Sequence, residues 1–179
     1  MNRTFIHPVK FATLAVFLFT LVSFSQEHPT ADPLEPDLKN IARQIMQTGS
    51  CILITQDKEG RSRARIMDPF EPEPDFTIWF GTNPKSRKVM QIKNHPRVTL
   101  CYTDTDGSGY VVINGKAELI DDPEEKNRRW KEQWNAFYPN RDTAYLLIRV
   151  IPEWLEVVSN SRGITGDPET WTPQKIVFK

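Results

Sequence analysis

The feature of this sequence that most restricts its fold is a series of short, apolar, strand-like runs separated by turn residues. Seven such runs occupy residues 50–56, 61–68, 76–81, 98–104, 110–120, 144–152 and 154–160. Most follow one another closely, whereas parallel strands would need a crossover of a dozen or more residues between each pair. The pattern therefore predicts a mainly β protein, an antiparallel barrel with helices packed outside it. Gly115, inside the fifth run, is expected to mark a β-bulge.

Three helices are expected between these runs. The first runs from Leu34 to Gly49, the second begins at Asn83 and Pro84 and ends before Pro96, and the third spans residues 121–139. Asn83 is the predicted cap of the second helix, and Asp121 or Asp122 that of the third. The apolar residues at helical spacing are Leu38, Ile41, Ala42, Ile45, Val89, Met90, Ile92, Trp130, Trp134 and Phe137.

The composition is that of a globular protein of ordinary size. The chain has 179 residues, of which 39% are hydrophobic, and 23 basic residues balance 23 acidic ones. One domain with a real core is expected. A balanced charge gives no reason to expect a nucleic-acid partner, which usually selects a basic excess. The spacing of His and Cys residues fits no metal site.

The N-terminal segment resembles an export signal rather than part of the domain. Basic residues Arg3 and Lys10 precede a run of about a dozen apolar residues, and small residues follow up to Ser25. We expect a signal peptide at residues 1–25, cleaved near Ser25, a Pro-rich linker at 26–36 and one domain at 37–179. The mature protein would then be periplasmic or extracellular, with no stable membrane insertion. An uncleaved anchor is the alternative, although the run is short for a spanning helix.

Two cysteines, Cys51 and Cys101, lie within strand-like runs. In an oxidising compartment they could form a disulfide. Two buried free thiols are an equally acceptable interpretation, because sequence does not give the distance between the two Cα atoms.

A cluster of cations stands where the second helix begins. Lys85, Arg87 and Lys88 fall within four positions, at the end of the helix whose dipole already carries positive charge. Either this is a solvated basic face, or an anion binds there. Thr82 and Ser86 add hydroxyl groups, and a first helical turn offers free backbone N–H groups. Together these groups could form a phosphate cradle.

The stretch WFGTNPKSRKVMQIKNHPRVTLCY resembles the pyridoxamine 5'-phosphate oxidase-like superfamily, the FMN-binding split barrels. The resemblance continues into VVINGKAELIDDPEEK and back to GRSRARIMD, and it covers roughly residues 35–160. The Trp-rich segment WKEQWNAFYPN is similar to the general-stress-protein branch. The resemblance implies an antiparallel split β-barrel, bound FMN and a homodimer with the flavin at the subunit interface.

The resemblance also implies roles for individual residues. Arg87 and Lys88 would hold the FMN phosphate with Ser86 and Thr82 nearby, and Arg65 would reach the phosphate or the ribityl chain. The residues implied along the isoalloxazine ring are Ile66, Met67, Asp68 and Gly81, with Tyr110 at a position where the oxidases have a flavin-contacting Gln. By contrast, Arg63 is expected on a solvated strand face, Trp130 and Trp134 in the core or an interface, and Trp171 in a packed tail.

The activity implied is that of an FMN-dependent oxidoreductase acting on an unknown small molecule, with no identified catalytic residue. A flavin-binding protein without turnover, a haem-binding barrel using His95, and a pure interaction module are the alternatives, and a deazaflavin could replace FMN. The Arg-x-His-x-Arg segment of the true oxidases has no counterpart in LEVVSNSRGITGDPETW. We therefore do not expect oxidation of pyridoxamine phosphate.

Overall fold

A computed structural model describes residues 35–47 and 51–179, all within one compact unit that spans residues 32–179. The predicted signal peptide, most of the linker and Gly49 lie outside the described residues. The elements are α1 (Glu35–Met46), β1 (Cys51–Gln56), β2 (Ser62–Met67), β3 (Ile78–Thr82), α2 (Arg87–Asn94), β4 (Arg97–Thr103), β5 (Gly109–Ile120), α3 (Pro123–Arg128), the 3-10 turn η1 (Glu132–Ala136), α4 (Arg141–Ala144), β6 (Leu146–Ser159), the 3-10 turn η2 (Asn160–Arg162) and β7 (Gln174–Val177).

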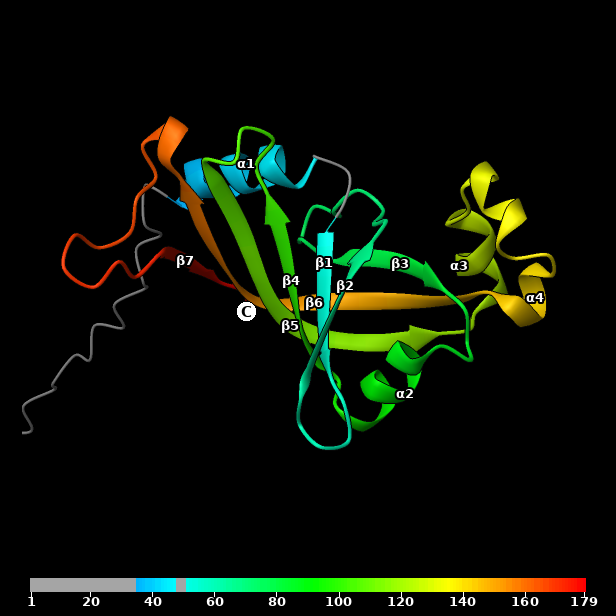
Figure 1. Ribbon diagram of the computed structural model, residues 1–179. Coiled ribbons are helices and arrows are strands. Elements are labelled where there is room, and N and C mark those ends of the chain that lie inside the picture. Colours follow the sequence, from blue (N-terminus) through cyan, green and yellow to red (C-terminus); the bar gives the residue numbers. More distant parts are fainter. Residues whose placement is uncertain (1–34, 48–50) are drawn as a thin grey trace, which may run out of the picture. The chain divides into compact units, whose positions relative to one another are not determined.

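The strands form one antiparallel sheet, as the sequence predicts. Its order is β2-β1-β4-β5-β6-β3, and β7 also pairs with β6. Beyond the end of β2, a bridge between Pro69 and Phe80 links its continuation to β3. Among the described residues this is the one bridge between the two edges of the curved sheet, which gives the split barrel visible in Figure 1. The predicted fold class is confirmed.

The core fills the inside of this sheet and is closed by α1. Residues of β1, β4 and β5 alternate between buried and more exposed positions, as a half-buried sheet requires. Leu38, Ala42 and Ile45 of α1 pack into the same core, and α1 lies across the sheet in Figure 1. The helical spacing of these residues therefore predicted the correct buried face.

The last two predicted strands form a single strand, β6, in the structure. Residues 144–152 and 154–160 are predicted as two separate strands, the first ending at Pro152. In the structure β6 runs without interruption through Pro152, which pairs with Gly115 of β5, and the register shifts between Asn114 and Gly115. The predicted bulge at Gly115 is confirmed, and the extra residue opposite it is Glu153, which directly follows the proline.

The predicted helix at 121–139 is wrong in its length. Asp122 does cap α3, since its side chain accepts from the backbone N–H of Glu125. The helix ends at Arg128, and 3-10 turn η1 and helix α4 follow separately. Arg129 and Lys131 have non-helical backbone angles, with φ −108° and ψ 75° at the first and φ −113° and ψ 129° at the second. The Tyr145 hydroxyl donates to the Arg129 carbonyl at this break. Packing against Tyr145 overrides the helical pattern of this segment.

The cysteines point to opposite sides of the sheet. Cys101 lies opposite Ile52, which is exposed on the outer face of the sheet. Cys51 directly precedes Ile52 in β1, so its side chain faces the core. Both thiols are free. The expected packing of the tail is wrong at Trp171, whose side chain is 83% exposed. Within residues 35–47 and 51–179, the structure contains no helix long and apolar enough to cross a bilayer.

Candidate functional site

The basic residues gather where β2, the end of β3 and the start of α2 meet. Arg65 lies opposite Leu53 in the β1–β2 ladder, on the side of β2 that faces the barrel. Thr82 ends β3, and Arg87 and Lys88 open α2 five and six residues later. We call the group of Arg65, Thr82, Ser86, Arg87 and Lys88 the cationic cradle.

The hydroxyl groups of the cradle are bonded to one another and to one cation. Lys88 donates from Nζ to Oγ1 of buried Thr82 at 2.9 Å, and this oxygen lies 3.2 Å from Oγ of Ser86. These bonds fix the ammonium group of Lys88 beside β3. The ammonium group has further hydrogens to donate to an acceptor.

Acceptor atoms on β1 and α2 hold the guanidinium group of Arg65 in place. Its Nη1 donates to the Leu53 carbonyl at 3.1 Å and to Oγ1 of Thr55 at 2.7 Å, and its Nη2 donates to Oε1 of Gln91 at 3.0 Å. Thr55 and Gln91 were not predicted as site residues. A sequence sign was present for Gln91, which lies three residues after Lys88 on the same helix face.

The charge of the cradle is not neutralised. Among the described residues, no carboxylate pairs with Arg65, Arg87 or Lys88. Burial lowers the pKa of Arg65, and the nearby positive charge of Arg87 lowers it further. Burial likewise lowers the pKa of Lys88, with Arg65 as the second cause. The three cations therefore repel one another, and an anion bound between them would relieve this repulsion.

Helix α2 begins later than predicted. Asn83 caps the preceding turn, where its Oδ1 accepts from Lys85 N at 2.8 Å. The N-cap of α2 is Ser86, whose side chain makes no capping hydrogen bond because its Oγ faces Thr82. The first turn also has no acidic residue. The positive end of α2 is thus left without a side-chain acceptor.

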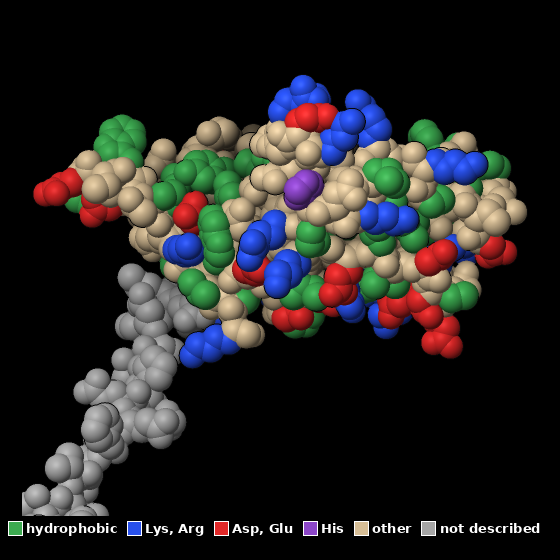
Figure 2. Space-filling view, turned by 90° about the horizontal axis from the view of Figure 1, so that it is seen from below, with side chains coloured by type: hydrophobic (Ala, Val, Ile, Leu, Met, Phe, Trp, Pro, Cys, Tyr) green, Lys and Arg blue, Asp and Glu red, His purple; other side chains and the backbone are tan. Residues whose placement is uncertain are grey.

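A cavity of about 350 Å³ adjoins the cradle. It is lined by Ile66, Met67, Asp68, Gly81, Thr82, Asn83, Lys88, Trp134, Phe137 and Tyr138. Six of these were predicted from the sequence: Ile66, Met67, Asp68, Gly81, Thr82 and Lys88. The structure thus brings together the residues predicted for the ring and part of the phosphate site. Figure 2 shows a face of the molecule on which Lys and Arg are interspersed with exposed hydrophobic side chains.

The aromatic wall of the cavity comes from the segment around η1. Trp134 donates from Nε1 to Oδ2 of Asp68 at 3.3 Å, and Lys131 bonds Oδ1 of the same carboxylate at 2.5 Å. The Trp134 and Tyr145 rings lie so close to Gly81 that a Cβ there would be 2.5 Å and 2.6 Å from them. The predicted core position of Trp134 is confirmed by its 7% exposure. Its place on the cavity wall was missed.

Tyr110 does not join the cradle within one chain. Tyr110 lies near the start of β5. The end of β3 at the cradle pairs with Leu146 and Leu147 of β6. This part of β6 pairs with the other end of β5, at Ile120. Ten residues of strand separate Tyr110 from Ile120, roughly 33 Å along an extended strand. Arg63 also lies outside the cradle, where it pairs with Asp57. This agrees with its expected place on a solvated strand face. His95 is at the opposite end of α2.

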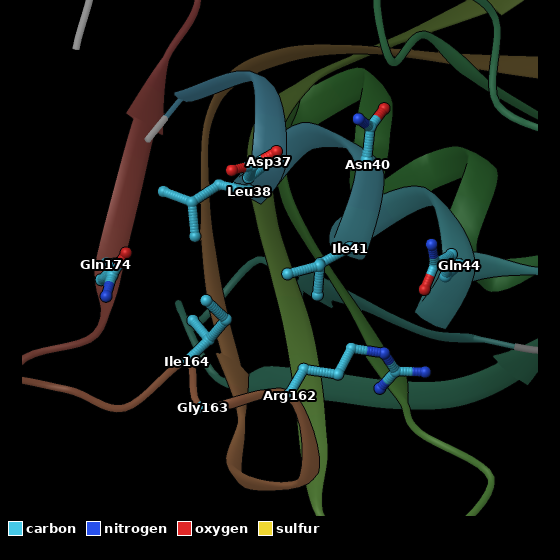
Figure 3. Close-up of a pocket in the computed structure, with 9 residues that line it drawn as sticks. All are labelled: Asp37, Leu38, Asn40, Ile41, Gln44, Arg162, Gly163, Ile164 and Gln174. Carbon is cyan, nitrogen blue, oxygen red and sulfur yellow. The ribbon is translucent and has the colours of Figure 1, made fainter. Parts of the chain in front are cut away.

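A second cavity, of about 540 Å³, lies between α1 and the loop after β6. Figure 3 shows Leu38 and Ile41 of α1 facing Ile164 across it. Its one arginine, Arg162, is already paired with the buried carboxylate of Asp104. This cavity is larger than the first but has no uncompensated cations, so the cradle is the stronger candidate for anion binding.

The comparisons with known proteins agree with this arrangement. A model described as pyridoxamine 5'-phosphate oxidase like matches residues 36–164. The chain belongs to this family. It is also 25% identical over 129 residues to General stress protein 26 of Bacillus subtilis (strain 168), covering 70% of this chain and 91% of that protein. The similarity to general stress proteins expected from the sequence is therefore found.

Solved structures of other proteins share this fold. The General Stress Protein 26 from Bacillus anthracis str. Sterne superposes with a TM-score of 0.63 at 20% identity, covering 79% of this chain and 98% of that one. A pyridoxamine 5'-phosphate oxidase-related, FMN binding protein from Nostoc punctiforme gives 0.55 at 14% identity, covering 84% and 99%. At these identities the likeness establishes the split-barrel architecture.

Proposed function

We propose that this protein binds FMN, with the phosphate in the cationic cradle and the ring in the adjoining cavity. The observation that carries the proposal is a set of three uncompensated cations, Arg65, Arg87 and Lys88, beside that cavity. A terminal phosphate carries up to two negative charges and three acceptor oxygens. It would accept from these cations and from the uncapped start of α2.

The residues around the cavity fit a flavin ring. Ile66 and Met67 offer apolar contacts and backbone groups, and Trp134 and Tyr138 offer aromatic surface on the other wall. Membership of the family and the FMN-binding relative support this choice over haem. A terminal phosphate in the cradle favours FMN over a deazaflavin whose phosphate is doubly esterified.

The reaction class we propose is oxidation and reduction of a small molecule. Bound flavin supplies hydride or electron transfer when present. The chain's own residues would bind and orient it. Asp68 accepts hydrogen bonds from Lys131 and Trp134, which hold its carboxylate on the cavity wall. We propose that substrate protons come from water or from the substrate itself.

A homodimer is part of the proposal, because an apolar patch borders the cavity. On the outer face of the sheet, Ile66, Ile52, Cys101 and Val112 lie opposite one another across β2, β1, β4 and β5. Ile66 is 77% exposed and also lines the cavity. A second copy seated on this outer-face patch would lie beside the flavin. Tyr110 is on the same face as Val112, so it would reach the site only from that second copy.

Export of the protein is a separate proposal, resting on the sequence of residues 1–25. Mass spectrometry of the protein recovered outside the cytoplasm should give an N-terminus close to residue 26. An intact N-terminus on all of the recovered protein would contradict cleavage.

The test of FMN binding is a titration followed by quenching of flavin fluorescence. Wild-type protein should bind saturably, and Arg87→Ala/Lys88→Ala should bind at least about a hundredfold more weakly, since two charge-assisted contacts are lost. Lys58→Ala/Lys93→Ala is the matched control, because it removes two exposed cations that lie away from the start of α2. Equal binding by wild type and Arg87→Ala/Lys88→Ala would show that the phosphate binds elsewhere.

A further inference from the structure

Within residues 35–47 and 51–179, only neutral oxygen atoms accept hydrogen bonds from the guanidinium of Arg65. Its three acceptors are the Leu53 carbonyl, the Thr55 hydroxyl and the Gln91 carboxamide. Thr55 is 1% exposed, so this network is fixed from inside the barrel. Buried or half-buried arginines more often pair with a carboxylate, as Arg129 does with Glu73 and Glu125 in this same chain.

Because arginine only donates hydrogen bonds, it fixes which atom donates and which accepts in this network. A guanidinium has donors and no acceptor, so the Thr55 and Gln91 atoms that face it must both be accepting oxygens. The Thr55 hydrogen is then left to donate to Oε1 of Gln91, at 2.6 Å. This assigns the orientation of the Gln91 amide: its oxygen faces Arg65, and its NH₂ group keeps its donors. In the described part of the chain these donors have no partner.

We propose that Gln91, supported by Thr55, is the positioning residue of the cradle and makes it specific for a dianionic phosphomonoester. The inference rests on the proposed phosphate site. Gln91 orients Arg65 toward the start of α2 and adds no negative charge, so all three positive charges remain for the ligand. A carboxylate at position 91 would hold Arg65 equally well but would cancel one of them.

The comparison of Gln with Glu at this position separates orientation from charge. Gln91→Glu keeps the size and both acceptor bonds, so apoprotein stability should be unchanged or higher. Its FMN affinity should fall about tenfold, because the phosphate then meets one positive charge fewer. Riboflavin has the same ring without the phosphate, so its affinity should not change. A structural defect would weaken both ligands together.

The experiment is a pair of titrations, with FMN and with riboflavin, on the full chain. Wild type is compared with Gln91→Glu, Gln91→Met and Gln44→Glu, the last adding the same charge on the exposed face of α1, beside the other cavity. Gln91→Met removes the acceptor without adding charge, and a several-fold loss of FMN affinity is expected from the loosened Arg65. Gln44→Glu should match wild type.

The outcomes are distinct from those that test FMN binding itself. A selective loss of FMN affinity in Gln91→Glu supports the role of Gln91. An unchanged ratio of FMN to riboflavin affinity in Gln91→Glu, with wild type binding FMN, would overturn this inference and leave the proposed function standing. Failure of wild type to bind FMN would overturn both.

Discussion

Two aromatic rings occupy the space beside Gly81 in which any other residue would place its Cβ. Gly81→Ala should therefore lower the free energy of unfolding by about 1–3 kcal/mol, since a new methyl must displace well-packed rings. Chemical denaturation monitored by tryptophan fluorescence measures this loss. The double variant Gly81→Ala/Trp134→Phe should show part of the loss restored, because Phe lacks the ring atoms closest to that Cβ. An additive effect of the two changes would contradict the packing account.

At the same scale, the sequence predicted charged site residues better than neutral ones. Arg87 and Lys88 stand out because cations are unfavourable at a helix start, and Arg65 was found by resemblance. Thr55 carries no such mark, and Gln91 has only its position three residues after Lys88, because an uncharged side chain gains its role from the fold that puts it beside Arg65. Trp134 was correctly predicted to be buried, yet its contact with Gly81 depends on a turn that no local pattern indicates.

At the scale of elements, periodicity located the strands, and tertiary contacts decided where they ended. The alternation of buried and exposed residues in β1, β4 and β5 was visible in the sequence, as was the bulge at Gly115. The continuity of β6 was not, because it depends on the pairing of Pro152 with Gly115 of β5. The helix expected at 121–139 is broken at Arg129, which is held by Tyr145 and Glu73 through contacts distant in sequence.

Strand register also predicts the redox state of the cysteines. Cys51 and Cys101 lie on adjacent strands but point to opposite faces, so a disulfide would require β1 or β4 to twist out of its ladder. We expect two free thiols even in protein purified from an oxidising compartment. Alkylation in denaturant without reductant, followed by mass spectrometry, should add two labels. A product with no label and a mass 2 Da lower would contradict the register.

At the scale of the whole molecule, stability should fall at alkaline pH. Burial raises the pKa of Cys51 from 9.0 to about 12, and burial also raises the pKa values of Tyr102 and Tyr145 above 10.0. Well below pH 9 these groups are protonated in both the folded and the unfolded protein, so they do not make the free energy of unfolding depend on pH. Above it the unfolded chain loses protons that the folded chain keeps, so unfolding is favoured by up to about 1.4 kcal/mol per group and pH unit.

Urea midpoints at pH 8 and pH 10.5 test this dependence. The midpoint should be lower at pH 10.5, and Cys51→Ala should show a smaller difference between the two pH values. Midpoints that differ equally in Cys51→Ala and wild type would show that the Cys51 thiol contributes nothing.

The assembly is also a property of the whole molecule. If the outer-face patch is the contact between two copies, Ile52→Glu/Ile66→Glu should convert a dimer into a monomer, because burying two carboxylates per chain costs more than the contact returns. Light scattering after size exclusion measures the mass. Trp171→Glu, a comparable change at an exposed site outside the patch, should leave the mass unchanged. Dimers in both variants would contradict this interface.

The most direct test of the central claim is a crystal structure of the protein with bound FMN. The account predicts the phosphate within hydrogen-bond distance, roughly 3 Å, of Lys88 Nζ and the Arg65 and Arg87 guanidinium groups, with the ring against Ile66 and Met67. FMN bound in the cavity between α1 and Arg162, or with its phosphate facing solvent away from α2, would contradict it.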